Sequence, residues 1–162
     1  MAEGQLSDPI TPAGMAALKA RYDHLFLTER PQMVETVSWA AGNGDRSENG
    51  DYLYGRKRLR EIDRELSHLA KRMADLQVVD PARQPDKTRV FFGATVVVAD
   101  EDDRQQTLTL VGRDEANASE GRIAWNSPVA VALKGAGTGQ SRTVRLPTGE
   151  RSLEVLEIRY PI

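Results

Sequence analysis

The sequence contains no cysteine, which excludes disulfide bonds, thiolate metal ligands and thiol nucleophiles together. Its two histidines, His24 and His68, are too few for a histidine-based metal centre. No run approaches the roughly 18 apolar residues of a membrane span. The opening stretch MAEGQLSDPI also lacks the basic and then apolar pattern of a signal peptide. We therefore expect a cytoplasmic protein without a membrane partner.

An excess of charge of one sign is also missing. The 22 basic and 24 acidic residues give a formal net charge of −2, so the total points neither to nucleic acid nor to a membrane surface. The length of 162 residues allows one ordinary domain or two small ones. Any argument about function must therefore come from the local distribution of residues.

The two halves of the chain differ in their apolar pattern. Residues 1–79 contain helical spacing and form an expected N-terminal coiled-coil domain, whereas short β-branched runs fill residues 90–162. Between them, residues 80–89 include two prolines and several polar residues, a composition typical of a linker. We expect an α+β protein with a helical hairpin followed by a small antiparallel sheet that packs against one short helix.

The first helix is expected to begin at Thr11, a suitable N-cap, with Pro12 at the first helical position. Pro31 predicts a kink or a break. Steps of three and four residues occur on both sides of it: Met15, Leu18, Tyr22 and Leu25 before, and Val34, Val37 and Ala41 after.

The second helix has the clearer pattern, a narrow apolar stripe that is typical of a coiled-coil seam. The stripe consists of Leu59, Ile62, Leu66, Leu69, Met73 and Leu76, with Tyr52 one heptad earlier. Two such helices joined by a bend form an antiparallel hairpin about 40 Å long, at roughly 1.5 Å per residue. Two helices of a small bundle are the alternative, but no third amphipathic helix is present to complete a bundle.

In the second half, five strand-like runs cover residues 90–100, 107–112, 122–126, 142–147 and 151–160. The segment SPVAVALKG predicts one short helix with Ser127 as N-cap, Pro128 at its first position and Gly135 just past its end. We find no nucleophile–base set or phosphate loop in this half, which favours a docking domain.

The bend between the helices, NGDRSENGDYLYGRKR (43–58), places acidic residues directly before basic ones. Asp45, Ser47 and Asn49 have the spacing of a calcium loop, but Arg56 stands where that loop needs a glutamate. Asp45 and Glu48 also match a helix capping box, a purely structural role, in which Ser47 or Asn49 are further cap candidates.

A third interpretation is that Asp45 and Glu48 act together. Residues three apart on a helix share a face, so the two carboxylates are close enough to bind one cation. Two carboxylates alone hold Mg²⁺ poorly, because this ion keeps most of its waters unless further ligands help. The pair is therefore half of a metal site, which works when it is inserted beside another protein's metal ion.

The basic flank of the second helix fits that interpretation. With the apolar seam facing inward, the outer face carries Lys57, Arg60, Arg64 and Lys71. A basic stripe of this kind is a candidate contact for the backbone of single-stranded nucleic acid. The alternative is an ordinary solvated face whose cations are balanced by Glu61, Asp63 and Glu65.

These residues resemble the Gre transcript-cleavage factors of bacterial RNA polymerase, and more closely the GreB type. The strongest matches are GDRSENGDYLYGRKRLREIDREL (44–66), ITPAGMAALKARY (10–22), ERPQMVETVSWAA (29–41), VFFGATV (90–96), SPVAVAL (127–133) and LPTGERSLEVLEIRY (146–160). GDRSEN is a specific motif, and the following KRLREIDR favours GreB over GreA. Gly50 and Gly55 depart from the family pattern and imply a looser tip, because glycine weakens a helix.

The resemblance implies a C-terminal FKBP-like domain that docks on RNA polymerase while the coiled coil enters the secondary channel. Asp45 and Glu48 fall on the catalytic acids of the family, which share a Mg²⁺ with the polymerase. Ser47, Asn49 and Tyr52 would shape the tip. The RNA-binding patch of the GreB type falls on four residues, Lys57, Arg58, Arg60 and Arg64.

The expected function is stimulation of RNA cleavage in backtracked complexes by a monomer that is not itself an enzyme. The partners are the polymerase and the 3′ segment of the backtracked RNA. The alternative is a regulator or inhibitor that occupies the channel without stimulating cleavage.

Overall fold

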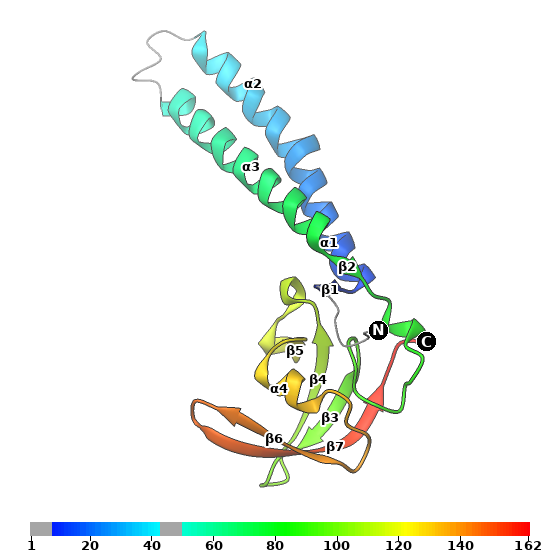
Figure 1. The fold of residues 1–162 in the computed structure, drawn as a ribbon. Coiled ribbons are helices and arrows are strands. Elements are labelled where there is room, and N and C mark those ends of the chain that lie inside the picture. Colours follow the sequence, from blue (N-terminus) through cyan, green and yellow to red (C-terminus); the bar gives the residue numbers. More distant parts are fainter. Residues whose placement is uncertain (1–7, 43–49) are drawn as a thin grey trace. The chain divides into compact units, whose positions relative to one another are not determined.

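Figure 1 shows the fold in a computed structural model, which describes residues 8–42 and 50–162. The predicted α+β class is confirmed, with helices in the first half and mainly strands in the second. The chain divides into two compact units. One is the hairpin unit, Met15–Asp75, and the other joins Met1–Gly14 to Leu76–Ile162.

The hairpin unit pairs two helical arms that run antiparallel (Figure 1). The first arm consists of α1 (Pro12–His24), the π-helical turn η1 (Leu25–Glu29) and α2 (Arg30–Ala41), and the second is α3 (Gly50–Asp75). The predicted stripe of α3 forms the core of the unit, where Ile62, Leu66 and Leu69 are buried against Leu25 of η1. The seam of the second arm is therefore confirmed.

The predicted start of the first arm is also confirmed. The backbone N–H of Gly14 donates a hydrogen bond to Oγ1 of Thr11 at 3.1 Å, and Pro12 opens α1. At Pro31 the chain neither breaks nor leaves the helix. The π turn precedes this proline, and there the N–H of Arg30 donates to the carbonyl of Leu25, five residues back. The wider turn accommodates a proline that has no N–H for the carbonyl of Leu27 and would crowd it in a regular α-helix.

The π turn changes which residues of α2 face the second arm. We expected Val34 and Ala41 in the seam, but 41% of Val34 is exposed, whereas Met33 packs against the core and Ala40 is fully buried. The extra residue of a π turn shifts the heptad register by one position, which rotates the following residues by about 100°. Without that shift, the spacing that begins at Met15 would continue inward at Gln32, Thr36 and Trp39.

The second unit is built on a five-stranded sheet in the order β5-β4-β3-β7-β6. Its strands are β3 (Thr95–Ala99), β4 (Gln105–Val111), β5 (Arg122–Ala124), β6 (Ser141–Leu146) and β7 (Gly149–Arg159). Neighbouring strands are antiparallel except β4 and β5, which run parallel, so the sheet is mixed rather than purely antiparallel as expected. The first predicted strand begins late, because Gly93 has a φ of +88° and residues 91–94 form a turn.

The predicted helix of this unit is α4 (Pro128–Leu133), with Ser127 as its N-cap and Gly135 at a φ of +81° just beyond it. Ala130 and Leu133 of α4 pack against the sheet in one core. The strand residues of that core include Val96, Val98, Leu108, Leu110 and Val155. In the expected linker, the 3₁₀ turn η2 (Pro81–Arg83) is capped by Asp80, and two further 3₁₀ turns are η3 (Arg113–Glu115) and η4 (Ala118–Glu120).

Residues 8–14 belong to the unit of the sheet although they precede the hairpin in sequence. The strand β1 (Pro9–Ile10) pairs in parallel with β2 (Gln77–Val78). One carboxylate oxygen of Glu115 accepts hydrogen bonds from the N–H of Thr11 at 3.0 Å and from that of Gly112 at 2.8 Å. The buried Asp8 pairs with Arg113 at 2.7 Å. These contacts fix the chain segment from which the first arm begins.

Candidate nucleic-acid interface

The predicted catalytic and metal-binding pair, Asp45 and Glu48, lies outside the described residues, as do Ser47 and Asn49. The described chain reaches them from both sides, at the end of α2 and at the start of α3. Tyr52, the remaining predicted tip residue, is half-buried in the first turn of α3. The Cζ atom of Arg56 lies 5.7 Å from the centre of the Tyr52 ring. The Tyr52 hydroxyl accepts a hydrogen bond from Nη1 of Arg56 at 3.3 Å. The basic residues of α3 therefore begin with Arg56, which packs on the ring of Tyr52.

Gly55 brings the two arms close together near this end of the hairpin. We expected it to loosen the tip, but it is buried within the seam. A Cβ atom at this position would lie 2.6 Å from Cγ2 of Val37 on the other arm. Only glycine fits such an approach without a shift of the helices or of Val37. The glycine thus tightens the packing of the arms instead of loosening it.

The basic face of the second arm consists of Lys57, Arg60, Arg64 and Lys71, all exposed on α3. Within residues 8–42 and 50–162, none of these four side chains has an ion-pair partner. Positive charge on one side of a helix attracts the phosphate backbone of a nucleic acid. The described geometry therefore leaves this face available to an anionic partner.

The acidic residues that were expected to balance the basic face are bonded elsewhere. Asp63 accepts from Arg30 at 2.7 Å, and Glu65 accepts from Arg21 at 2.9 Å. Both arginines come from the first arm. The hydrogen bond from Arg21 lowers the pKa of Glu65, which keeps this carboxylate charged and paired. The arms thus use the acids of α3 for their own association and leave its outer cations unneutralised.

Arg58 differs from the other predicted RNA-binding residues. Its side chain is 24% exposed, and its Nε donates to Glu29 of the first arm at 2.7 Å. A second contact reaches Glu61 at 3.4 Å. These bonds raise the pKa of Arg58, with the hydrogen bond to Glu29 as the main cause. In this structure Arg58 crosslinks the two arms, while Lys57, Arg60 and Arg64 point outward.

The sheet unit contains a separate cleft of about 370 Å³. Apolar side chains from α4 and from all five strands of the sheet line it, among them Val98, Leu108, Val129, Val144 and Leu153. Its rim includes Asp100, which pairs with Arg151 at 3.2 Å. The N–H of Arg104 hydrogen-bonds to Asp100 and lowers the pKa of this carboxyl group. The cleft is an apolar surface of the kind a docking domain requires.

Comparison with known proteins identifies both halves of the chain. Residues 8–78 match the family model described as "Transcription elongation factor, N-terminal", and residues 84–160 match "Transcription elongation factor, GreA/GreB, C-term". The chain belongs to the GreA/GreB family. The resemblance expected from the tip motif is thereby confirmed.

Among relatives of known name, the GreB type is the more similar. Transcription elongation factor GreB of Neisseria meningitidis serogroup B is 48% identical over 151 residues, which cover 93% of each chain. GreB of Yersinia pestis is 48% identical over 155 residues, or 95% of this chain and 90% of that one. A GreA of Alkalilimnicola ehrlichii is 35% identical over 153 residues, or 94% of this chain and 97% of that one.

Solved GreA/GreB structures align along most of the chain, but loosely. The factor from Nitrosomonas europaea is 21% identical, covers 94% of this chain and 99% of its own, and has a TM-score of 0.41. Assignment to the GreA/GreB family depends on the sequence matches.

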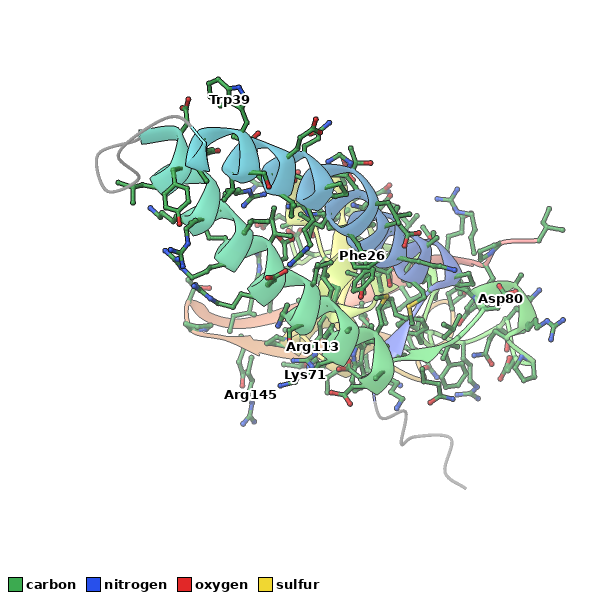
Figure 2. All side chains as sticks on the ribbon, turned by 90° about the horizontal axis from the view of Figure 1, so that it is seen from above. Phe26, Trp39, Lys71, Asp80, Arg113 and Arg145 are labelled. Atoms are coloured by element: carbon green, nitrogen blue, oxygen red, sulfur yellow. The ribbon has the colours of Figure 1, made fainter. Side chains whose placement is uncertain are left out.

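The spacing of residues along the first arm does not predict the exposure of Trp39. Its side chain extends away from α2 (Figure 2), and 63% of the residue is exposed. A signal was present, because Trp39 falls on the heptad positions that continue from Met15 and Leu25, yet Met33 occupies the seam. The π turn explains why Met33 is buried although Trp39 continues the spacing of the earlier seam residues. A single sequence contains no reliable signal for such a turn.

Proposed function

We propose that this chain is a bacterial transcription elongation factor that stimulates RNA polymerase to hydrolyse backtracked nascent RNA. The end of the hairpin enters the secondary channel, and Asp45 and Glu48 act beside the catalytic metal of the polymerase. The factor works in the cytoplasm as a monomer and is not an enzyme by itself. The observation that carries this proposal is its 48% identity to GreB factors along nearly the whole chain.

The unneutralised basic face supports the same function. An RNA 3′ segment that has been extruded into the channel presents phosphates, which Lys57, Arg60 and Arg64 would hold along α3. Because Asp63 and Glu65 pair with arginines of the first arm, they do not compete for these cations. The basic face is therefore the positioning surface for RNA. Arg58 supports it by holding α3 against Glu29.

The residues fit a shared Mg²⁺ site by their donor chemistry. Mg²⁺ prefers oxygen ligands, which Asp45 and Glu48 supply, but it needs more than two carboxylates. In residues 8–42 and 50–162 there is no cluster of three or more His, Asp or Glu side chains that would complete such a site. The missing ligands are accordingly expected from the polymerase and the RNA. When bound there, the ion supplies charge stabilisation and an activated water for phosphodiester hydrolysis.

A backtracked elongation complex labelled at the RNA 3′ end tests the proposal. With Mg²⁺, the wild-type factor is expected to release short 3′ fragments. Asp45→Ala or Glu48→Ala should abolish release while binding to the polymerase survives. Asp51→Asn is the matched control, because it removes a neighbouring acidic charge to which we assign no catalytic role. This control should retain cleavage.

The same assay separates cleavage stimulation from the alternative function, a channel-binding regulator or inhibitor. If the wild-type factor binds but releases no fragments, the inhibitor is the better description. Release that persists in both alanine variants would instead remove Asp45 and Glu48 from the mechanism.

A further inference from the structure

The outer face of α2 carries a shallow depression that is wide open to solvent and is called the hollow below. The hollow has a volume of about 520 Å³ and is lined by Gln32, Glu35, Thr36 and Trp39. Trp39 is 63% exposed, and in Figure 2 its side chain extends outward from the end of α2. A single exposed apolar residue is ordinary on a protein surface and needs no explanation by itself. What sets Trp39 apart is its place beside the polar side chains of Gln32, Glu35 and Thr36.

The register of the first arm confirms that folding does not require Trp39. Met33 packs in the core and Val37 contacts the position of Gly55, so the seam is filled without the tryptophan. The π turn at Leu25–Glu29 supplies the single extra residue that turns this face outward. Inserted π turns occur frequently at functional sites. The structure thus turns outward a large aromatic ring that an uninterrupted helix would have buried.

The chemistry of the hollow favours a cationic side chain. Glu35 and Trp39 are four residues apart and share one face of the helix. Glu35 has no ion-pair or hydrogen-bond partner in the described parts of the chain. An indole ring attracts a cation above its face, and a neighbouring carboxylate accepts hydrogen bonds from a planar guanidinium. Together they fit an arginine side chain.

A nucleic acid fits the same hollow less well. Trp39 would stack on a base, but the charge of Glu35 repels the adjoining phosphates. The only cation of α2, Arg30, is already paired with Asp63. The outer surface of the first arm is therefore unlike the basic face of α3.

We propose that the hollow of Trp39 and Glu35 binds an arginine side chain of RNA polymerase. This contact anchors the first arm to protein while the second arm faces RNA. The inference rests on the proposed function, because it takes the polymerase as the partner. It is tested on core polymerase without RNA, so that its failure is distinct from a failure of cleavage.

Binding to core polymerase provides the main measurement. Trp39→Ala is expected to raise Kd about fivefold to tenfold, and Glu35→Gln about twofold to fivefold. The double variant should bind more tightly than the product of the two single effects predicts, because both side chains contact one arginine. Trp39→Phe should recover part of the loss. Val34→Ala, which trims another exposed apolar residue of α2, is the matched control and should leave Kd unchanged.

Thermal unfolding shows whether these variants remain folded. Trp39→Ala should keep the wild-type Tm, since the residue contributes little to the core. A photo-crosslinking amino acid in place of Gln32 then identifies the contacted molecule. A crosslink to a polymerase peptide that contains an arginine supports the proposal, and replacing that arginine by alanine should then cost less affinity with Trp39→Ala than with the wild-type factor.

Three results would overturn the inference. The first is an unchanged Kd for Trp39→Ala, and the second is full additivity of Trp39→Ala with Glu35→Gln. The third is a crosslink in an elongation complex that joins the factor to RNA and not to the polymerase. That result would make a nucleobase the occupant of the hollow. A wild-type factor that binds core polymerase through Trp39 yet releases no RNA fragments would sink the proposed function alone.

Discussion

The two arms of the hairpin pack against each other but present different chemistry to their surroundings. The second arm, α3, keeps a regular apolar stripe, and its outer face displays cations that have no ion-pair partner among the residues the structure describes. The first arm contains a π turn and exposes the apolar side chains of Phe26, Leu27, Val34 and Trp39, whereas α3 exposes Leu53 and Tyr54. The difference gives the two arms of one coiled-coil pair chemically distinct surfaces.

The division of charge follows from how the arms are held together. Arg21 and Arg30 of the first arm reach across to Glu65 and Asp63 of the second. Each bond neutralises a cation of the first arm and an acid of the second. The exposed ion pairs themselves contribute little stability. Their larger effect is to leave the first arm weakly charged and the second arm basic.

The largest expected effect comes from changing the register of the first arm. Deleting Ala20 from the regular helix α1 should push Met15 and Leu18 out of line with Leu25. A leucine-sized side chain lost from a core costs about 2–5 kcal/mol, and because Met15 and Leu18 are half-buried we expect a loss near the lower end of that range and unfolding at a lower temperature. Circular dichroism during heating measures the change.

Deleting Thr28, an exposed residue of the π turn, is the matched control. It removes the extra residue, so that Met33, Val37 and Ala40 fall on heptad positions of an ordinary α-helix that continues from Leu25. When Pro31 is also replaced by alanine, we expect the free energy of unfolding to change by less than about 1 kcal/mol, because a proline in the resulting regular α-helix would by itself cost about 3 kcal/mol. Equal damage from the two deletions would contradict the register shift and with it the explanation for the exposure of Trp39.

The next effect concerns the basic face of the second arm. Replacing Arg60 and Arg64 together by glutamate should slow the rescue of deeply backtracked complexes about tenfold, because the extruded RNA loses two phosphate contacts. Complexes backtracked by only a few nucleotides should be affected less. Cleavage rates at increasing salt should also show a shallower dependence for this variant.

Lys19→Glu reverses an exposed cation of the first arm and serves as the control for charge alone. It should leave deep and shallow rescue nearly unchanged. A uniform loss in the Arg60 and Arg64 variant at every backtracking depth would argue against RNA contact along α3.

Local signals made part of this structure predictable from sequence. The caps at Thr11 and Ser127 depend on neighbouring residues, and the stripe around Ile62 has a regular spacing that no other element disturbs. The place of Val34 was mispredicted because the π turn responds to Pro31 and to packing against the second arm. The contact of Glu115 with Thr11 joins residues 104 positions apart, which no local pattern encodes.

The candidate site was predicted unevenly for a related reason. Lys57, Arg60 and Arg64 follow from their helical spacing, yet their freedom from ion pairs depends on arginines of the other arm. Arg58 belongs to the same basic stretch of sequence, but its environment differs because it pairs with Glu29. Spacing within one helix cannot reveal which charges the partner helix takes up.

A smaller effect distinguishes two glycines of the second arm. Gly55→Ala places a Cβ atom 2.6 Å from Val37, so we expect a loss of about 1 kcal/mol even after the gain in helix propensity. Gly50→Ala meets nothing within 4 Å and should stabilise the hairpin by up to about 1 kcal/mol. Urea denaturation measures both. Val37→Ala should restore most of the stability lost in Gly55→Ala, whereas a Gly55→Ala variant as stable as Gly50→Ala would contradict the close approach.

The smallest expected effect is the pH dependence of the bond between the arms at Glu65. Its pKa is lowered in the folded state from an ordinary value of 4.5, mainly by the hydrogen bond from Arg21. A lowered folded-state pKa adds stability above about pH 4.5, and that stability is lost as the pH falls through the folded value. Because the pair is exposed to solvent, we expect only about 0.3–0.5 kcal/mol. Glu65→Gln should therefore lower Tm slightly at pH 6, with the difference vanishing near pH 3. Arg21→Met should reproduce this profile without adding to it, whereas additive losses would show that the two residues stabilise the arms separately.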